Sequence, residues 1–462
     1  MCTVAAVGLS VAAVVVVGDW GAGHPDAWDE RVVDLAAFVE RERGLDFEHP
    51  VRVDSLTEAE YSEAARVDEG LLTDEDRELL DESAAVLEAL GLVPAGTDLL
   101  DATNEMADTG TLAYYDPITE TVTVRGTEIT TVLAATLVHE LTHVAQDQAF
   151  DLERVFDDES GSGEGFHALV EGDAVRIEAA YVESLAADEQ DAYWDDYLGQ
   201  LDDAEAGLDT VPPAVQAMFA APYVLGDPFV ALVAADGGNR AVDEAFASPP
   251  ASSEHLIEPG SFFAGDEPVE VDDPDLPDGA ERVGEPDALG AVGLFVLLSE
   301  RLDAEVALAA ADGWGGDRYA VFRDADRTCA RVDLVADTPG DLDEVAAALR
   351  DWAAAGPAGA AAVEVAGETV MLESCAAGAE AGEQASGGAS LDALTLPAAR
   401  AQLAVVGATQ AGLDRDGALD LGACFVDRVP LETLLQANES PDPPAEVSAA
   451  VADAMVACVG GP

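Results

Sequence analysis

One helical segment with two histidines and a glutamate in an uncharged setting constrains this chain more than any other feature. Residues 127–148 are predicted to form a long apolar helix, and positions 139–143 within it read HELTH. Apart from those three side chains, residues 136–145 carry no charge, so we expect the helix to be buried. Buried imidazole and carboxylate groups need polar partners, because unpaired polar groups inside a protein are costly. The rest of the fold must therefore bring such partners to this helix.

The spacing of these groups is typical of a zinc site that activates water. On a helix, His139 and His143 lie about 40° apart around the axis, so both imidazoles can reach one ion. Zinc takes such nitrogen ligands, and a catalytic zinc site keeps one coordination position for water. Glu140 is offset from His139, so its carboxylate can accept a proton from that water without ligating the ion. The alternative is a core helix with satisfied histidines and a solvated glutamate.

The third protein ligand is expected on the helix that follows. This helix is predicted over residues 166–185, after an acidic loop at 151–165 that reverses the chain. If the two helices pack antiparallel, a rise of about 1.5 Å per residue places Glu171 opposite the second histidine of the motif. His167 shares a face with Glu171 and is the competing candidate. Asp173 points about 160° away from Glu171 and cannot ligate the same ion from a regular helix.

The two predicted helices resemble those of a known group of enzymes. With HELTHVAQDQ at 139–148 and EGDA at 171–174, they resemble the gluzincin-type zinc metallopeptidases. They are more similar to a set of exported bacterial proteins with HELTHALQDQ and EGDA motifs. The resemblance spans about residues 51–375 and leaves out the C-terminal part. It also covers YYDP at 114–117, SSEH at 252–255 and GWGGDRY at 313–319.

The resemblance implies a role for each residue of the motif. It assigns His139, His143 and Glu171 to a zinc ion. It makes Glu140 the general base. It also implies that the hairpin predicted at 111–124 supplies the edge strand against which such peptidases hold an extended substrate. The spacing from the second histidine to the glutamate ligand is longer here than in the best-known gluzincins.

Two further roles have candidates by residue type alone. No residue clearly matches the tyrosine or histidine that steadies the oxyanion in gluzincins, and His255, Arg318 and Tyr319 are the candidates. The alternatives are a solvated loop histidine and a Gly-rich turn that enters a strand. Asp147, one turn beyond the second histidine, is predicted either to orient that imidazole or to be a solvated carboxylate.

Charge excludes two classes of partner. The 462 residues include 20 arginines and no lysine against 94 acidic residues, which gives a formal net charge of −74. Phosphate backbones and anionic lipid surfaces would be repelled, so we expect neither nucleic acid nor a membrane surface as partner. In molar salt the Debye length falls to about 3 Å and the self-repulsion largely disappears. We therefore interpret the composition as halophilic, with ordinary solubility as the alternative.

The N-terminus carries an apolar run of signal-peptide length. Residues 3–17 are short for a membrane span, and no second stretch is predicted to cross a membrane. Residues 1–18 are therefore predicted to be an export signal or an N-terminal anchor. We expect an extracellular or cell-envelope protein with no other membrane contact.

The cysteines fit an oxidising compartment. Four follow the export segment, and none forms a CxxC motif or a Cys/His cluster, so disulfides are favoured over metal binding. We favour Cys329–Cys375 and Cys424–Cys458, because each pair would lie within one compact segment. The other two pairings stay open.

The predicted fold class is α+β, with four parts after the export segment. Residues 24–245 are predicted to form a zincin-like metallopeptidase core, in which an edge hairpin accompanies two metal-bearing helices. Residues 246–375 form a smaller α/β region that completes this core. A linker at 376–390 leads to a small disulfide-linked helical module at 391–462. The other predicted elements are helices at 26–43, 73–92, 287–311 and 342–354, strands at 51–53, 319–324, 329–335 and 362–372, and a loop at 249–263.

The function expected from this pattern is hydrolysis of peptide bonds by a zinc-activated water, with Glu140 as general base and a peptide or protein as substrate. The alternative is a non-catalytic envelope protein in which zinc clamps two helices and the C-terminal half binds a partner. Retention of Glu140 favours catalysis, because a clamp needs only ligands. The missing oxyanion residue favours the alternative.

Overall fold

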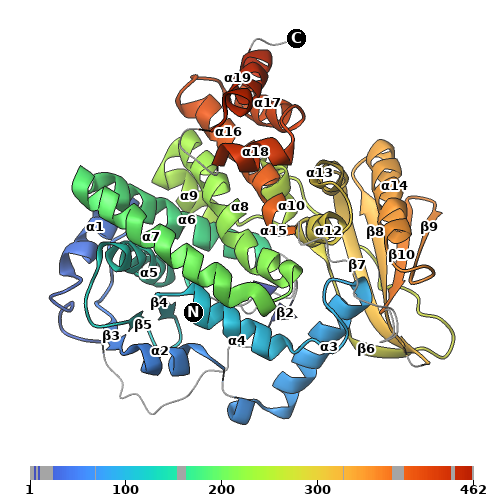
Figure 1. Ribbon diagram of the computed structural model, residues 1–462, viewed down its shortest axis with the longest axis horizontal. Coiled ribbons are helices and arrows are strands. Elements are labelled where there is room, and N and C mark those ends of the chain that lie inside the picture. The colour runs from blue at the N-terminus through green and yellow to red at the C-terminus, as the bar shows by residue number, and fades with distance from the viewer. Residues whose placement is uncertain are drawn as a thin grey trace.

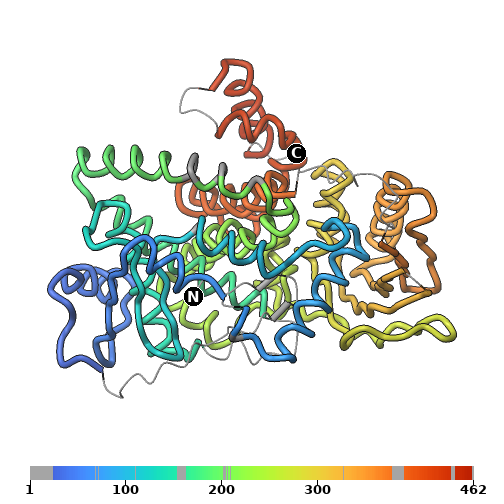
Figure 2. The backbone as a smooth tube through the Cα atoms, turned by 60° about the horizontal axis from the view of Figure 1, so that its bottom comes forward, coloured from blue at the N-terminus to red at the C-terminus, as the bar shows by residue number. Residues whose placement is uncertain are grey.

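A computed structural model describes Ala5–Ala6, Leu9–Ser10 and residues 24–67, 69–152, 163–325, 327–376, 390–438 and 443–459. The fold is α+β, as predicted: a large helical body carries a five-stranded sheet on one side (Figure 1). The C-terminal helices rise above this body, and the view in Figure 2 shows the sheet and α1 at opposite ends.

The helices are α1 (Val33–Arg43), α2 (Glu58–Ala65), α3 (Asp74–Leu90), α4 (Leu99–Gly110), α5 (Thr131–Phe150), α6 (Gly163–Ser184), α7 (Ala187–Gly207), α8 (Pro213–Gly237), α9 (Asn239–Ala247), α10 (Glu254–Ile257), α11 (Pro259–Ala264), α12 (Gly290–Ser299), α13 (Ala304–Asp312), α14 (Pro339–Ala355), α15 (Ser390–Ala393), α16 (Thr395–Thr409), α17 (Arg415–Val426), α18 (Leu431–Asn438) and α19 (Ala445–Val459). The strands are β1 (Ala5–Ala6), β2 (Leu9–Ser10), β3 (Arg52–Leu56), β4 (Ala113–Asp116), β5 (Thr121–Arg125), β6 (Glu281–Asp287), β7 (Trp314–Asp324), β8 (Arg327–Ala336), β9 (Ala361–Ala366) and β10 (Thr369–Cys375).

The two helices that carry the motif lie together in the body. Helix α5 begins at Thr131 rather than at 127, because the Thr130 side chain caps it by accepting from the Leu133 amide. The middle of α5 is buried throughout, as its uncharged sequence predicts. Helix α6 packs against α5 on one side and against α8 on another. Most of the acidic loop predicted between α5 and α6, residues 153–162, lies outside the described residues.

Two glycines allow α6 and α8 to cross closely. A Cβ on Gly172 would lie 2.2 Å from the backbone carbonyl of Gly226, and a Cβ on Gly226 would lie 2.2 Å from the carbonyl oxygen of Ala168. Those distances are shorter than any real contact, so the two backbones touch where both side chains are missing. The glycine of the EGDA motif is therefore required by packing.

The hairpin predicted before the motif is confirmed and belongs to a three-stranded sheet. The order is β3-β5-β4, with β3 parallel and β4 antiparallel to β5. Strand β4 forms one edge of this sheet and packs against α5. The hairpin therefore lies beside the helix that carries the motif.

The second sheet has the order β6-β7-β8-β10-β9 and is antiparallel throughout. The single strand predicted over 362–372 is wrong: the chain turns at Gly367, whose φ is 67°, and forms β9 and β10. Cys329 and Cys375 lie opposite each other on β8 and β10 and form a disulfide, and Cys424–Cys458 joins α17 to α19. Both favoured pairings are confirmed.

Three other expectations need correction. The predicted loop at 249–263 contains α10 and α11, because Pro259 starts α11 and the Glu258 side chain accepts from the Gly260 amide. The predicted helix at 26–43 begins only at Val33. Helix α8 is long and apolar enough to cross a membrane by length and composition, but 61% of its apolar window is buried inside the protein. It packs against α6 and α16, which accounts for its apolar character.

The α6–α8 crossing gives a stability prediction with a matched control. Gly172→Ala forces the two backbones apart and is expected to lower the free energy of unfolding by at least roughly 1–3 kcal/mol. Gly199→Ala makes the same change on α7 where a Cβ meets nothing within 4 Å, so it should raise helix stability by up to about 1 kcal/mol. Denaturant unfolding of both variants measures the difference. Equal effects would contradict the close crossing.

Candidate metal centre

Three side chains meet between α5 and α6. His139 Nε2 lies 3.0 Å from His143 Nε2 and 3.2 Å from Glu171 Oε2, and His143 Nε2 lies 3.3 Å from the same oxygen. All three residues are buried. The structure therefore brings together the residues that the sequence predicted as metal ligands.

The size of this triangle fits a tetrahedral zinc site. With zinc–nitrogen and zinc–oxygen distances of about 2.0–2.2 Å, the ligand atoms of a regular tetrahedron are about 3.3–3.6 Å apart. The observed edges of 3.0–3.3 Å are close to these values. Two imidazoles and one carboxylate also form a donor set that catalytic zinc sites use. The residues present therefore fit a zinc ion with one coordination position left open.

His143 has a fixed tautomer because of Gln146. The amide nitrogen of Gln146 donates to the Val170 carbonyl and to Asp173 Oδ2, each at 3.1 Å. Its oxygen therefore faces His143 and accepts from Nδ1 at 2.9 Å. With its proton on Nδ1, His143 presents the lone pair of Nε2 to the cluster, as a metal ligand requires.

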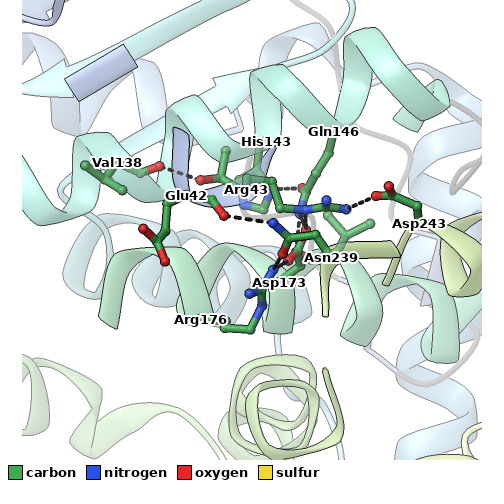
Figure 3. A network of polar contacts seen from close by, with 11 residues as sticks. Glu42, Arg43, Val138, His143, Gln146, Asp173, Arg176, Asn239 and Asp243 are labelled. Carbon is green, nitrogen blue, oxygen red and sulfur yellow. Dashed lines mark hydrogen bonds and ion pairs between the residues drawn. The ribbon is translucent and has the colours of Figure 1, made fainter. Parts of the chain in front are cut away.

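Behind Gln146 lies a fully buried ion pair. Arg43 on α1 donates to Asp173 at 2.5 Å, both side chains are 0% exposed, and Arg176 donates to the other oxygen of Asp173 at 2.7 Å. Burial raises the pKa of Asp173, but the two arginines outweigh it and hold this pKa below its ordinary range. Figure 3 shows how Arg43, Asp173 and Gln146 lead to His143. The pair thus anchors the partner of a metal ligand.

His139 is oriented by a carboxylate, that of Glu178, rather than by an amide. Its Nδ1 lies 3.3 Å from Glu178 Oε2, two turns beyond Glu171 on α6. Burial opposes protonation, but Glu171 and Glu178 outweigh it and raise the pKa of His139 above its ordinary range. Burial likewise raises the pKa of Glu171, and the surrounding histidines bring it well below the ordinary value. The centre therefore favours an ionised Glu171 as ligand.

His167 does not join the triangle but touches it. Its Nε2 lies 3.3 Å from Glu171 Oε1, the oxygen that faces away from the other two histidines. This contact positions the carboxylate so that Oε2 alone points at the cluster. The competing ligand candidate is thus a neighbour of the ligand.

Glu140 and Tyr223 border the centre. Glu140 is 5% exposed, and its carboxylate makes no hydrogen bond or ion pair with the part of the chain that the structure describes. Its charge acts on His139. Tyr223 comes from α8, and its ring lies 6.4 Å from the ring of His139 and 6.5 Å from that of His167. Neither Tyr223 nor Gln146 was among the sequence candidates. The packing of α8 brings Tyr223 here, whereas Gln146 lies three residues after His143 on α5, a helical spacing that could have indicated it.

The remaining candidates have other partners. Asp147 accepts from the Tyr115 hydroxyl at 2.7 Å and from the Leu152 amide at 2.9 Å, so Gln146 and not Asp147 orients His143. The reason is helix geometry, because Asp147 lies toward the hairpin. His255 Nε2 bonds to the Asp266 carbonyl at 3.1 Å, and burial lowers its pKa. It is buried on α10 rather than solvated.

Tyr319, Arg318 and the Gly-rich motif belong to β7 in the second sheet. Within that motif, Asp317 accepts from the Leu289 and Gly290 amides at 2.7 and 2.9 Å and caps the start of α12. Tyr319 is 4% exposed, and burial raises its pKa. Arg318 pairs with Asp273 at 3.3 Å. The motif therefore joins β7 to the start of α12, and the contacts of Asp317 and Arg318 lie in this part of the fold.

Comparison with known proteins gives one partial match. A family model described as a domain of unknown function (DUF8575) matches residues 281–387. This stretch contains the five-stranded sheet with α12, α13 and α14, and every residue of the metal centre lies outside it. No curated protein and no solved structure matches the chain.

Gln146 gives a prediction about metal affinity. Gln146→Leu removes the acceptor of His143 Nδ1 while leaving the three ligands in place, and zinc affinity is expected to fall about 10–100-fold. Gln190→Leu is the matched control, because the Gln190 amide bonds only to backbone carbonyls of the α6–α7 turn. Competition with a zinc chelator measures both affinities. A Gln146→Leu protein that binds zinc as tightly as the control would contradict this role.

Glu164, at the start of α6, gives a prediction about pH. Burial raises the pKa of Glu164 from 4.5 to about 7, with smaller contributions from Asp287 and Asp317. Because Glu164 binds its proton more tightly in the folded state, the free energy of unfolding falls as pH rises from about 4.5 to 7. Glu164→Gln removes this loss. Its effect on the free energy of unfolding, relative to wild type, should therefore be more favourable at pH 8 than at pH 4.5 by up to roughly 3 kcal/mol.

Unfolding by denaturant at both pH values measures the effect of Glu164→Gln. Glu183→Gln, at an exposed position of the same helix, is the matched control. A gain from Glu164→Gln that is the same at both pH values, or the same in the control, would contradict the assignment.

Proposed function

We propose that this protein is an exported zinc-dependent peptidase, in line with its resemblance to gluzincin-type metallopeptidases. The proposal rests on the triangle of His139, His143 and Glu171, together with a buried Glu140 on the same helix whose charge acts on His139. The three ligands would hold zinc, which supplies a lowered pKa to water and polarises a carbonyl group. A structural clamp would need only its three ligands, so the buried Glu140 favours catalysis.

The side chains around the centre would have different roles in peptide hydrolysis. Glu140 would take the proton of the attacking water and pass it to the nitrogen of the leaving amine. Gln146 and Glu178 would keep the two ligand histidines in the tautomer that leaves Nε2 free. Tyr223, whose ring lies beside His139, is the candidate to donate a hydrogen bond to the oxygen of the reacting carbonyl.

A peptide is the substrate class that the neighbouring sheet favours. Strand β4 is an edge strand and packs against α5, which carries the motif. An extended peptide can add to such an edge by backbone hydrogen bonds, which bind any sequence. This placement supports peptides or proteins as substrates.

Export is supported by the cysteines. The two disulfides suit an oxidising compartment. The predicted export segment, residues 1–18, lies mostly outside the described residues. Together with the net charge of −74, these features favour a protein that works outside the cytoplasm in salty surroundings.

A second candidate function is a non-catalytic envelope protein in which zinc clamps α5 to α6. One observation favours it: His255 and Tyr319, the candidates for steadying the oxyanion, make their contacts in other parts of the fold. The two functions differ in what Glu140 does, because a clamp would not need this carboxylate.

Glu140→Gln separates the two functions. This variant keeps the three ligands, so after dialysis both it and the wild type should retain about one zinc per chain. Peptide cleavage in molar salt should fall by about 10²–10⁴-fold or more, because the general base is lost. A broad peptide library read by mass spectrometry measures cleavage, and metal analysis measures zinc.

Two controls accompany Glu140→Gln. His143→Ala should lose both the zinc that survives dialysis and cleavage, and Glu183→Gln, an exposed acid on α6, should keep both. Cleavage by Glu140→Gln at the wild-type rate would contradict the peptidase. Zinc that His143→Ala retains through dialysis as tightly as the wild type would contradict the site.

A further inference from the structure

A second group of metal-binding side chains lies away from the metal centre, where three chain segments meet. His24 begins the described range 24–67, His49 precedes β3, and Glu120 sits in the turn between β4 and β5. Glu120 Oε2 lies 2.9 Å from His24 Nδ1 and 3.7 Å from His49 Nε2. The two imidazole rings stack with centroids 3.4 Å apart. Ligand atoms of all three residues lie within 4.8 Å of one another.

Glu120 provides an independent sign that this group has a ligand. Its φ is 46°, a left-handed conformation that a glutamate adopts at a cost and that glycine or asparagine would adopt more easily. Its Oε2 is buried and lacks a hydrogen bond of normal geometry within the described part of the chain. Its contact with His24 Nδ1 at 2.9 Å lacks hydrogen-bond geometry, and buried polar atoms without a hydrogen bond are rare in folded proteins. A cation between the carboxylate and the imidazoles would satisfy this oxygen.

The donor set selects the kind of cation. Two imidazole nitrogens and one carboxylate oxygen suit Zn²⁺, Co²⁺, Ni²⁺ or Cu²⁺, whereas Mg²⁺ and Ca²⁺ prefer oxygen ligands alone. This matters for a chain with 94 acidic side chains, whose surface carboxylates attract any cation. Nitrogen donors allow discrimination in the presence of molar salt.

The surroundings of His49 determine how tightly an ion would bind. Gln148, at the end of α5, accepts from the Glu48 amide at 2.7 Å and donates to the His49 carbonyl at 3.0 Å. Its amide nitrogen therefore also faces His49 Nδ1, at 3.3 Å. Neutral His49 accepts there and carries its proton on Nε2. Binding an ion at Nε2 moves this proton to Nδ1, where Gln148 offers no acceptor.

We propose that His24, His49 and Glu120 form a second, weaker binding site for a divalent transition-metal ion such as Zn²⁺. It is weaker than the metal centre because the centre gives an acceptor to Nδ1 of each ligand histidine. A bound ion would join His24, ahead of α1, to the edge hairpin through Glu120. It would also join the hairpin to His49, which is hydrogen-bonded to the end of α5. The proposal does not depend on peptidase activity.

Zinc and cobalt titration of the metal-free full-length protein in molar salt tests the proposal. Wild type should bind two ions per chain with separable affinities, and the visible spectrum of Co²⁺ should show nitrogen ligation at both steps. His49→Ala and Glu120→Gln should lose the weaker step and keep the tighter one. His143→Ala should do the reverse, which separates this site from the metal centre.

Two further variants sharpen the titration. Glu128→Gln removes the same charge from an exposed position near the hairpin and should leave both steps unchanged, which controls for binding to the acidic surface. Gln148→Glu supplies an acceptor for His49 Nδ1 and should tighten the weaker step about 10-fold or more. A single ion per wild-type chain, or a second step that survives in both His49→Ala and Glu120→Gln, would overturn the proposal.

Discussion

The buried pair of Arg43 and Asp173 is the interaction on which the metal centre depends. Both side chains are fully buried, so removal of either would break a buried pair and leave the other charge with a single remaining ion-pair partner in the described part of the chain, Arg176 for Asp173 or Asp243 for Arg43. The pair also fixes the geometry of its neighbours. Asp173 holds the amide of Gln146, and that amide sets the tautomer of His143. An ion pair between α1 and α6 thus determines which nitrogen faces the cluster.

A few partly buried arginines form ion pairs that join separate segments of this acidic chain. Arg400 pairs with Glu258 and Asp312, and Arg125 pairs with Asp108, so each arginine joins separate segments of the chain through partly buried side chains. Partly buried pairs are screened by salt much less than exposed charges are. Molar salt therefore removes most of the surface repulsion from a net charge of −74 and leaves these internal bridges largely intact. The distribution of charge, more than its total, fits salty surroundings.

Local patterns predicted local structure well. The hairpin and the two helices that carry the HELTH and EGDA motifs follow from alternation and apolar periodicity, which act over a few residues. Helix spacing also placed Glu171 opposite the two histidines. Contacts between distant segments were beyond such reasoning: Tyr223 reaches the centre only through the packing of α8, and the contacts of Gln146 with Val170 and Asp173 depend on the packing of α5 against α6. In the Gly-rich motif at 313–319 the structure gives Asp317 a packing role, because its carboxylate accepts from the amides at the start of α12.

The EGDA segment shows why a short motif can require several residues for different reasons. Glu171 supplies an oxygen to the cluster, Gly172 lets α8 approach, and Asp173, on another side of α6, holds Gln146 and Arg43. Helix periodicity points these three residues to different sides of α6, because successive residues lie about 100° from one another around the axis. A chain with Glu171 alone would have a ligand without its support. The candidate metal centre is therefore a property of four packed helices, α1, α5, α6 and α8, and the charge buried between them.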